Sequence, residues 1–308
     1  MASTAESLTI DVKRASQPPA RRSGVFISTG RFLKRLFRDK PLGAVGAVIC
    51  LIFLFCGIFA DVIAPYGMNE IKLTSRLKAP SWDHLFGTDN LGRDLFSRSL
   101  YGAQISVIIG LAAATLATCI SVIIGIMSGY LGGKFDMIVQ RMVDAWMSFP
   151  DLIVLIVVAA VLGPGTWQII GLLGLVLGIG GSRIIRSAVV SVRENMYVHA
   201  AQSIGASTAR ILWRHILPNV LPAVIVLFTT RVGTVILAES TLSFLGYGVP
   251  PPAPTWGGML SGSGRTFMFQ GPWLVIFPGL CLTLVVYGVN VFGDALRDLL
   301  DPRMRGSK

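Results

Sequence analysis

The run YGAQISVIIGLAAATLATCISVIIGIMSGY, residues 101–130, contains no charged side chain and is longer than one membrane crossing requires. A helix rises 1.5 Å per residue, so about 20 apolar residues cross the ~30 Å hydrocarbon layer of a bilayer. The rest of the chain has the same character, because 53% of its 308 residues are hydrophobic and only 14% are charged. Soluble domains carry about 25% charged residues. The composition therefore predicts a membrane protein.

Five further apolar runs flank residues 101–130, and each is long enough for a crossing. They cover residues 42–63, 139–162, 166–182, 220–242 and 272–293. The run 166–182 is short and rich in glycine, and the run 220–242 carries Arg231 near its middle, so we expect either helix to be tilted or packed deep in the bundle. The sequence predicts an all-α protein with six transmembrane helices.

The positive charges set the orientation of these helices. Residues 1–40 hold nine Lys and Arg residues, spread too widely for the short basic start of a cleavable signal peptide. If the N-terminus is cytoplasmic, inner segments carry 20 of the 27 Lys and Arg residues and outer segments carry six. The positive-inside rule then places both termini in the cytoplasm. The net charge of +11 indicates a basic rim beside membrane lipid, and nucleic-acid binding is disfavoured because the charges lie on four separate segments.

Cysteine and histidine predict neither a disulfide framework nor a metal site. All four cysteines lie inside predicted spans, where a free thiol behaves as a small apolar group, and none forms a C-x-x-C pair: Cys50, Cys56, Cys119 and Cys281. The three histidines, His84, His199 and His215, lie outside the spans.

Two outer segments have unusual sequences. The first contains FGTDNLGRDLFSRSLYG, residues 86–102. We expect its apolar residues to pack onto the helix ends, with turns at Gly87 and at Asn90 or Gly92; these apolar residues are Trp82, Leu85, Phe86, Leu91, Leu95 and Phe96. Its charged residues either take part in the same packing or contact an external partner through Asp89, Arg93 and Asp94.

The second outer segment, FLGYGVPPPAPTWGGMLSGSG, spans residues 244–264 and combines four prolines with clustered glycines. Such backbone is stiff but irregular, and within a membrane it is tolerated only where protein covers it or where it lines a wet cavity. Two interpretations stay open. The segment is either a surface loop or part of the mouth of a pathway, with Trp256 as a further candidate for partner contact.

The inner segment RIIRSAVVSVRENMYVHAAQSIGASTARILWRHILP, residues 183–218, is far longer than a connection between neighbouring helices needs. Ala200, Ala201, Ile204 and Gly205 form a small apolar patch at helical spacing, and we expect its alanines to face the cytoplasm. Gly205 is a natural helix stop, and Ser207 can cap a second helix that ends before Pro218. Two short helices that meet at a right angle would suit docking into a groove of a cytoplasmic partner. The alternative is a helix that lies on the bilayer surface.

Three features inside the spans bear on packing and function. Gly125-x-x-x-Gly129 and Gly174-x-x-x-Gly178 allow helix backbones to approach closely. A charge at mid-span costs about 2.5–3.5 kcal/mol on insertion scales, so Arg231 should face the bundle interior, water or a partner. Two interpretations of Arg231 stay open. It forms a structural ion pair, with Glu239 or with a partner subunit, or it contacts substrate.

Absent motifs exclude several activities. The chain has no G-x-x-x-x-G-K-[ST] loop, since GYLGGKF has the wrong glycine spacing and Phe135 after the lysine, so ATP hydrolysis requires a separate subunit. No span contains a histidine that could activate a nucleophile, which disfavours a membrane enzyme. A secondary transporter without ATP is the remaining alternative, disfavoured by the few ionisable residues in the spans and the absence of a clear repeat.

The sequence from His199 to Asn219 resembles the cytoplasmic signature of inner-membrane permease subunits of binding-protein-dependent ABC importers, E-A-A, three residues, G, nine residues, I-x-L-P. Ala200, Ala201, Gly205, Leu217 and Pro218 match, whereas His199 and His215 replace the glutamate and the isoleucine. The two outer segments and FGDALRDLLDPRMR near the C-terminus resemble the C-type subunit of the subgroup that imports di- and oligopeptides, nickel complexes or glutathione. The similarity covers residues 30–305.

The resemblance implies a type I ABC importer permease with a cytoplasmic coupling helix. It divides the chain into a basic tail (1–40), a first helix with its outer segment (41–100), a core of five helices (101–294, with a coupling segment at 183–218 and an outer loop at 243–271) and a C-terminal tail (295–308). Coupling to the ATPase is assigned to a set of neighbouring residues: His199, Ala200, Ala201, Ile204, Gly205 and Ala206. The stretch from Phe86 to Gly102 is expected to help receive a loaded binding protein.

The same resemblance implies the partners. They are a homologous B-type permease subunit, one or two cytoplasmic ATPase subunits that hold ATP and Mg, and an extracytoplasmic substrate-binding protein; this chain itself is expected to bind no cofactor. The location would be a bacterial or archaeal cytoplasmic membrane. Peptide is the first choice of substrate, with nickel chelates, glutathione and haem as alternatives, and Arg231 and Glu239 are the candidates for the pathway.

Overall fold

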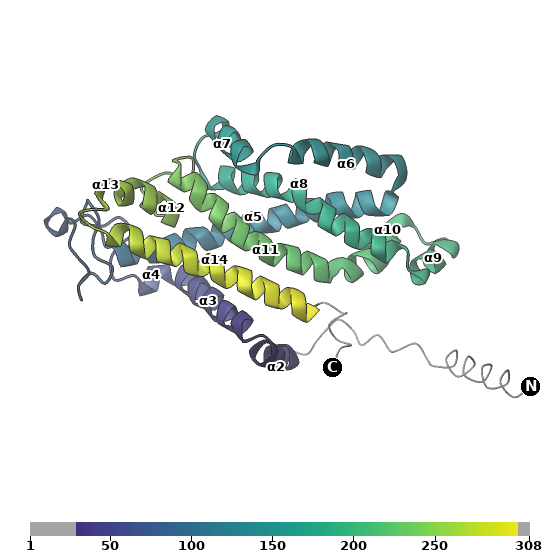
Figure 1. The fold of residues 1–308 in the computed structure, drawn as a ribbon, viewed down its shortest axis with the longest axis horizontal. Helices are drawn as coiled ribbons and strands as arrows, with labels where there is room; N and C mark the ends of the chain where they lie inside the picture. The colour runs from purple at the N-terminus through teal and green to yellow at the C-terminus, as the bar shows by residue number, and fades with distance from the viewer. Residues whose placement is uncertain (1–28, 301–308) are drawn as a thin grey trace, which may run out of the picture.

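The computed structural model describes residues 29–300, and in this range it is a bundle of helices without a named strand (Figure 1). The long helices are α3 (Pro41–Ile58), α5 (Leu95–Leu131), α8 (Thr166–Arg193), α11 (Leu217–Phe244) and α14 (Trp273–Leu300). All five are long and apolar enough to cross a membrane, and the bent pair α6 (Gly133–Met147) and α7 (Asp151–Leu162) provides a sixth crossing. The predicted all-α fold with six crossings is confirmed.

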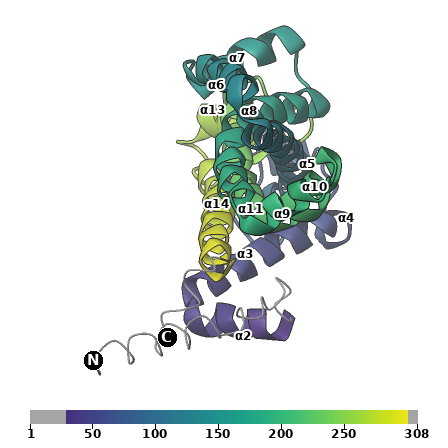
Figure 2. The same ribbon diagram turned by 90° about the vertical axis from the view of Figure 1, so that its right-hand side faces the viewer.

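The shorter helices lie at the two ends of the bundle. At one end are α2 (Thr29–Asp39), α9 (Met196–Ser203) and α10 (Thr208–Ile211), and at the other are α4 (Ala60–Ile63), α12 (Trp256–Met259) and α13 (Arg265–Phe267) (Figure 1). The positive-inside rule identifies the end with α9 and α10 as the cytoplasmic end. Figure 2 looks at this end and shows α6 and α7 on one flank, with α2 and α3 on the opposite flank.

Helices α5 and α8 form the centre of the bundle, and glycine brings their backbones together. A Cβ atom added at Gly178 would lie 2.8 Å from the Ile120 Cβ and 2.9 Å from the Ala117 carbonyl oxygen, and one added at Gly125 would lie 2.7 Å from the Ser182 carbonyl oxygen. These distances leave no room for any side chain. The prediction that the small-residue pairs permit close approach of helices is therefore confirmed.

The third predicted span, 139–162, is wrong as a single helix. It consists of α6 and α7, which meet at 82° across a break of three residues. Pro150 has extended backbone angles, φ −60° and ψ 125°, and its ring disfavours helical geometry at the preceding residue. The proline therefore ends one helix at mid-crossing and begins the next.

The predicted inner segment 183–218 is also shorter than expected. Helix α8 continues to Arg193 because its arginines find carboxylates on α6: Arg183 pairs with Asp144 and Arg186 with Asp136. The Arg186 Nε donates to Asp136 Oδ1 at 2.6 Å. These partners allow a charged stretch to extend an otherwise apolar helix.

The sequence predicts that the second helix of that segment ends before Pro218, and this prediction is wrong. It runs on through a π-helical turn, Leu212–Ile216, into α11. Proline lacks the N–H group that a continuous helix needs. The π-helical turn nevertheless leads directly into α11, so α10 and α11 form one helical run from Thr208 to Phe244, and the Asn219 side-chain amide donates to the His215 carbonyl at 2.7 Å within it.

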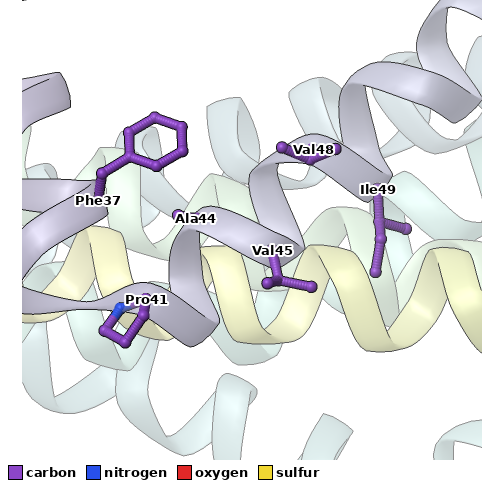
Figure 3. Close-up of a pocket in the computed structure, with 6 residues that line it drawn as sticks. All are labelled: Phe37, Pro41, Ala44, Val45, Val48 and Ile49. Atoms are coloured by element: carbon purple, nitrogen blue, oxygen red, sulfur yellow. The ribbon is translucent and has the colours of Figure 1, made fainter.

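The N-terminal helix α2 packs at the corner where α3 begins. Leu36 is buried with Ala44 and Ala295, and Lys40 pairs with Asp298 at 2.6 Å. A hollow of about 280 Å³ follows this corner along α3, and Figure 3 shows its apolar lining: Phe37, Pro41, Ala44, Val45, Val48 and Ile49. This lining offers no polar side chain that could orient a polar substrate.

Candidate functional site: the coupling segment, the outer cap and the mid-membrane charges

A sharp turn separates α9 from α10 at the cytoplasmic end. Gly205 has a φ of +77°, a conformation that suits glycine and disfavours other residues, and no atom lies within 4 Å of the place where its Cβ would be. Its N–H donates to the Gln202 carbonyl at 2.9 Å, and the Ala206 N–H donates to the Ala201 carbonyl at 3.1 Å. Ser207 then caps α10 by accepting a hydrogen bond from the Arg210 N–H. The predicted stop and cap are confirmed.

One face of α9 is held firmly against the bundle. Val198 is fully buried and Ala201 is 7% exposed, both in a cluster with Ile211 and Ile216. The Gln202 side chain also donates to the Tyr130 hydroxyl at 3.3 Å. The expectation that every alanine of the patch faces the cytoplasm is therefore wrong for Ala201, because the helix needs one small residue where it crosses the bundle.

The opposite face of α9 is open. His199, Ala200 and Gly205 are exposed, Ala206 is half-buried, and Ile204 is 85% exposed although it is one of the most apolar residue types. A hollow of about 540 Å³ lies between this face and α10, lined by Tyr197, Ala200, Ala201, Ile204, Gly205, Ala206, Arg210, Arg214 and His215. Figure 2 shows α9 and α10 side by side at the end of the bundle. This shape offers an apolar projection beside a basic hollow.

The three charged candidates of the first outer segment, Asp89, Arg93 and Asp94, bind groups within the segment. Asp89 is 1% exposed and accepts hydrogen bonds from the Leu91 and Arg93 N–H groups at 2.8 and 3.0 Å, while its other oxygen binds the Arg93 Nε at 2.6 Å. Asp94 caps α5 through the Ser97 N–H at 2.8 Å and contacts the His84 Nδ1 at 2.9 Å. These contacts support the packing interpretation for Asp89 and Asp94. Only the Arg93 side chain retains some exposure, at 15%.

Two of the aromatic and aliphatic residues expected to pack onto the helix ends do not do so. Trp82 is 96% exposed and Leu85 is 46% exposed. Phe86 does pack, because its ring stacks on Phe277 with 4.1 Å between centroids. The segment therefore leaves a single large indole in contact with solvent at the outer end.

The second outer segment folds over the bundle. Trp256 is 1% exposed, and its Nε1 donates to the Ser99 carbonyl at 3.2 Å, so the side chain lies inside the protein and not on a partner surface. Arg98 reaches the Pro252 carbonyl at 3.4 Å. A cavity of about 340 Å³ remains between the two outer segments, with Asp89, Arg93 and Arg98 on one wall and residues 246–263 on the other. The expectation of irregular backbone is wrong for Trp256–Phe267, because short helical turns form there.

Of the interpretations of Arg231, the ion pair with Glu239 is wrong. The residues lie eight positions apart on α11, about 12 Å along the helix. Glu239 is fully buried and accepts a hydrogen bond from the Ser243 hydroxyl at 2.6 Å and a longer one from Ser240 at 3.4 Å. Within residues 29–300, Arg231 makes no ion pair and its Nε has no hydrogen-bond partner.

Sequence reasoning missed the ion pairs that join α6 to α8. Asp136 and Asp144 lie about two turns apart on α6 and pair with Arg186 and Arg183 on α8. The signal was present, because acidic residues at spacing 8 in one crossing and arginines at spacing 3 in the next can share a face. They form a charged seam between the central helices and the flank.

The chain matches two protein families along its length. Residues 121–306 match the binding-protein-dependent transport system inner membrane component, and residues 29–80 match the N-terminal TM domain of oligopeptide transport permease C. The first match covers more than half of the chain and includes the coupling segment and α11.

Curated relatives are similar over nearly their full length. A dipeptide transport system permease protein of Alkalihalophilus pseudofirmus is 38% identical, with 94% of this chain and 95% of the relative covered. An oligopeptide transport system permease protein of Bacillus subtilis is 40% identical over 87% and 88% of the two chains. A probable D,D-dipeptide transport system permease protein of Escherichia coli is 39% identical over 91% and 93%.

A solved structure shares the fold. A chain of the inward-facing MetNI methionine ABC transporter superposes with a TM-score of 0.54 and 17% identity, over 66% of this chain and 96% of that one. This likeness concerns the arrangement of the helices alone. The family match over residues 121–306 and the relatives of 38–40% identity show that the chain belongs to the inner membrane components of binding-protein-dependent transport systems.

Proposed function

We propose that the chain is the C-type permease subunit of an ATP-driven importer of di- or oligopeptides, working with a B-type permease, one or two ATPase subunits and an external binding protein. The names of three relatives, each 38–40% identical over most of the chain, support the substrate class. The second family match, to an oligopeptide permease domain over residues 29–80, supports the same choice. ATP and Mg would be held by the partner subunits.

The single observation that carries the coupling role is the open face of α9. Ile204 is 85% exposed at the end of a helix whose other face is fixed to the bundle. Exposed apolar side chains on well-ordered helices mark contact surfaces. The hollow beside it, with Arg210, Arg214 and His215, would receive an acidic or polar edge of the ATPase. The set His199, Ala200, Ala201, Ile204, Gly205 and Ala206 remains the proposed coupling site, with Ala201 acting from the buried side.

The proposed cycle is a two-state equilibrium biased from both faces. Closure of the ATPase subunits around ATP would bring the coupling helices of the two permeases together and favour the outward-open state. The loaded binding protein would favour the same state from outside. Each partner shifts the equilibrium only by the difference in its affinity for the two states.

The test compares two glycines that differ only in location. Gly205 and Gly133 both have positive φ, at +77° and +56°, and neither has an atom within 4 Å of its missing Cβ. A Trp at either position therefore costs a similar backbone strain of about 1–2 kcal/mol. Only Gly205 lies on the open face of α9.

We expect Gly205→Trp to release the ATPase subunits during purification in mild detergent and to abolish ATP-dependent peptide uptake in proteoliposomes. Gly133→Trp should keep both properties. Equal behaviour of the two variants would show that α9 is not the docking site. Uptake by the wild-type complex that continues without ATP would instead contradict the ATP-driven importer.

A further inference from the structure

The guanidinium group of Arg231 lies at the middle of α11 in a space that glycine creates. Its Nη2 is 3.2 Å from the place where a Cβ on Gly181 would be, so any side chain at position 181 would displace it. The group is half-buried, and its Nε is buried without a hydrogen-bond partner within residues 29–300. An unsatisfied, charged donor at this depth is costly, and no carboxylate of residues 29–300 forms an ion pair with it.

The end of α6 lies against this part of α8, because the Met147 side chain is 3.9 Å from the place where a Cβ on Gly180 would be, and Asp151 is the first residue of α7. Asp151 is exposed, and among the described residues no ion pair joins it to Arg231. Each therefore keeps free hydrogen-bonding capacity toward a third group.

The broken crossing places Asp151 at this level. Helix α6 ends at Met147 and α7 begins at Asp151, with an 82° bend between them. Helix ends exposed at mid-membrane carry partial charges and unpaired backbone groups, and transporters of other folds use such breaks for ion and substrate binding. Nearby, Arg183 pairs with Asp144 about 3 Å closer to the cytoplasm than Gly181. This ion pair and Arg231 thus both lie within two residues of Gly181 on α8, and the bend between α6 and α7 precedes Asp151.

We propose that Arg231 and Asp151 form a mid-membrane site for the charged ends of the transported peptide, in which Arg231 binds the C-terminal carboxylate and Asp151 binds the N-terminal ammonium group. This inference rests on the proposed function. A guanidinium group offers paired N–H donors that match a carboxylate, and the terminal charges of a dipeptide lie at most about 7 Å apart. Separated opposite charges suit a zwitterion better than either a cation or an anion alone.

The first test uses the whole complex in proteoliposomes with ATP and its binding protein. The substrates are a dipeptide with a free carboxylate and its C-terminal amide, drawn from pairs for which calorimetry shows that the binding protein takes both. Arg231→Gln should lower the uptake of the free acid about tenfold relative to the amide. Arg183→Gln removes the same charge from nearly the same depth, but from a side chain that already has a partner, and it should leave the ratio unchanged.

If Arg231→Gln lowers the uptake of both substrates equally, or of neither, the ratio of free acid to amide stays unchanged and the proposal is overturned. Loss of the second permease subunit from the purified Arg231→Gln complex would also overturn it, because it would identify a structural ion pair across the subunit interface. Wild-type complex that imports neither peptide would contradict the proposed peptide function itself.

The second test asks whether the site is reached from the pathway. The four native cysteines, Cys50, Cys56, Cys119 and Cys281, are replaced by alanine, and Arg231→Cys is introduced. An anionic methanethiosulfonate reagent should modify this thiol, and dipeptide should slow the modification at least threefold. Val235→Cys, fully buried one turn along α11, is the control and should not react. No reaction at position 231, or reaction without protection, would overturn the proposal.

Discussion

Replacement of Gly178 by alanine tests whether the α5–α8 contact holds the bundle together. The new methyl carbon would lie 2.8 Å from the Ile120 Cβ, against an optimum of about 3.5 Å between carbon atoms, so the helices must separate by roughly 0.7 Å. The Ala117 carbonyl oxygen, 2.9 Å away, belongs to the backbone and cannot rotate aside. Overpacking of this kind costs about 1–3 kcal/mol.

Gly171, two turns earlier on the same helix, provides the matched control. No atom lies within 4 Å of its missing Cβ, so alanine there only reduces the freedom of the unfolded chain and should stabilise the helix by about 0.5–1 kcal/mol. The two variants should therefore differ by about 1.5–4 kcal/mol in free energy of unfolding. In thermal melts of the purified permease complex in detergent, this difference corresponds to about 3 °C or more.

The opposite signs of the two shifts are the decisive feature of this experiment. A Gly178→Ala complex that melts at or above the wild-type temperature would refute the close contact between α5 and α8. Equal destabilisation by both substitutions would show that glycine is needed along α8 for its flexibility and not for space.

Three further substitutions test other contacts. Arg186→Met should lower the unfolding free energy by about 2 kcal/mol because it leaves Asp136 without its cation, and a second substitution, Asp136→Asn, should restore part of the loss in a double-mutant cycle. Trp256→Phe keeps the packing but removes the hydrogen bond to a helix carbonyl, so thermal melts should show a loss of about 1 kcal/mol, against 3–5 kcal/mol for Trp256→Ala. Asp94→Ala should cost about 1–2 kcal/mol by removing the cap of α5, whereas Asp83→Ala, on the exposed surface of the same segment, should stay within 0.5 kcal/mol of wild type.

Hydrophobic length and charge asymmetry were sufficient to predict the fold class and the number of crossings. The stop at Gly205 and the cap at Ser207 were also predictable, because each depends on local backbone chemistry. The break in the third crossing was not recognised, although Pro150 was its signal. An apolar run long enough to cross the membrane conceals a bend, since hydrophobicity is the same on both sides of it.

The side-chain partners could not be predicted, because they join distant segments. Asp94 contacts His84, ten residues earlier, and Trp256 donates to the Ser99 carbonyl, 157 residues earlier. The side chains of Asp94 and Trp256 therefore lie in the interior, although the sequence made them candidates for contact with an external partner. An ion pair between Arg231 and Glu239 was one of the interpretations that the sequence left open. The two residues lie about 12 Å apart along α11, and Glu239 accepts hydrogen bonds from Ser240 and Ser243 of the same helix instead.

In the proposed cycle, the helical run from Thr208 to Phe244 would act as a lever. Its 37 residues span about 55 Å at 1.5 Å per residue, from the hollow beside α9 to the outer loop. A 10° tilt about its midpoint would move each tip by about 5 Å in opposite directions, while Arg231, close to the fulcrum, would hardly be displaced. A push at the cytoplasmic tip would thereby become an opposite swing at the outer tip around a nearly stationary charge.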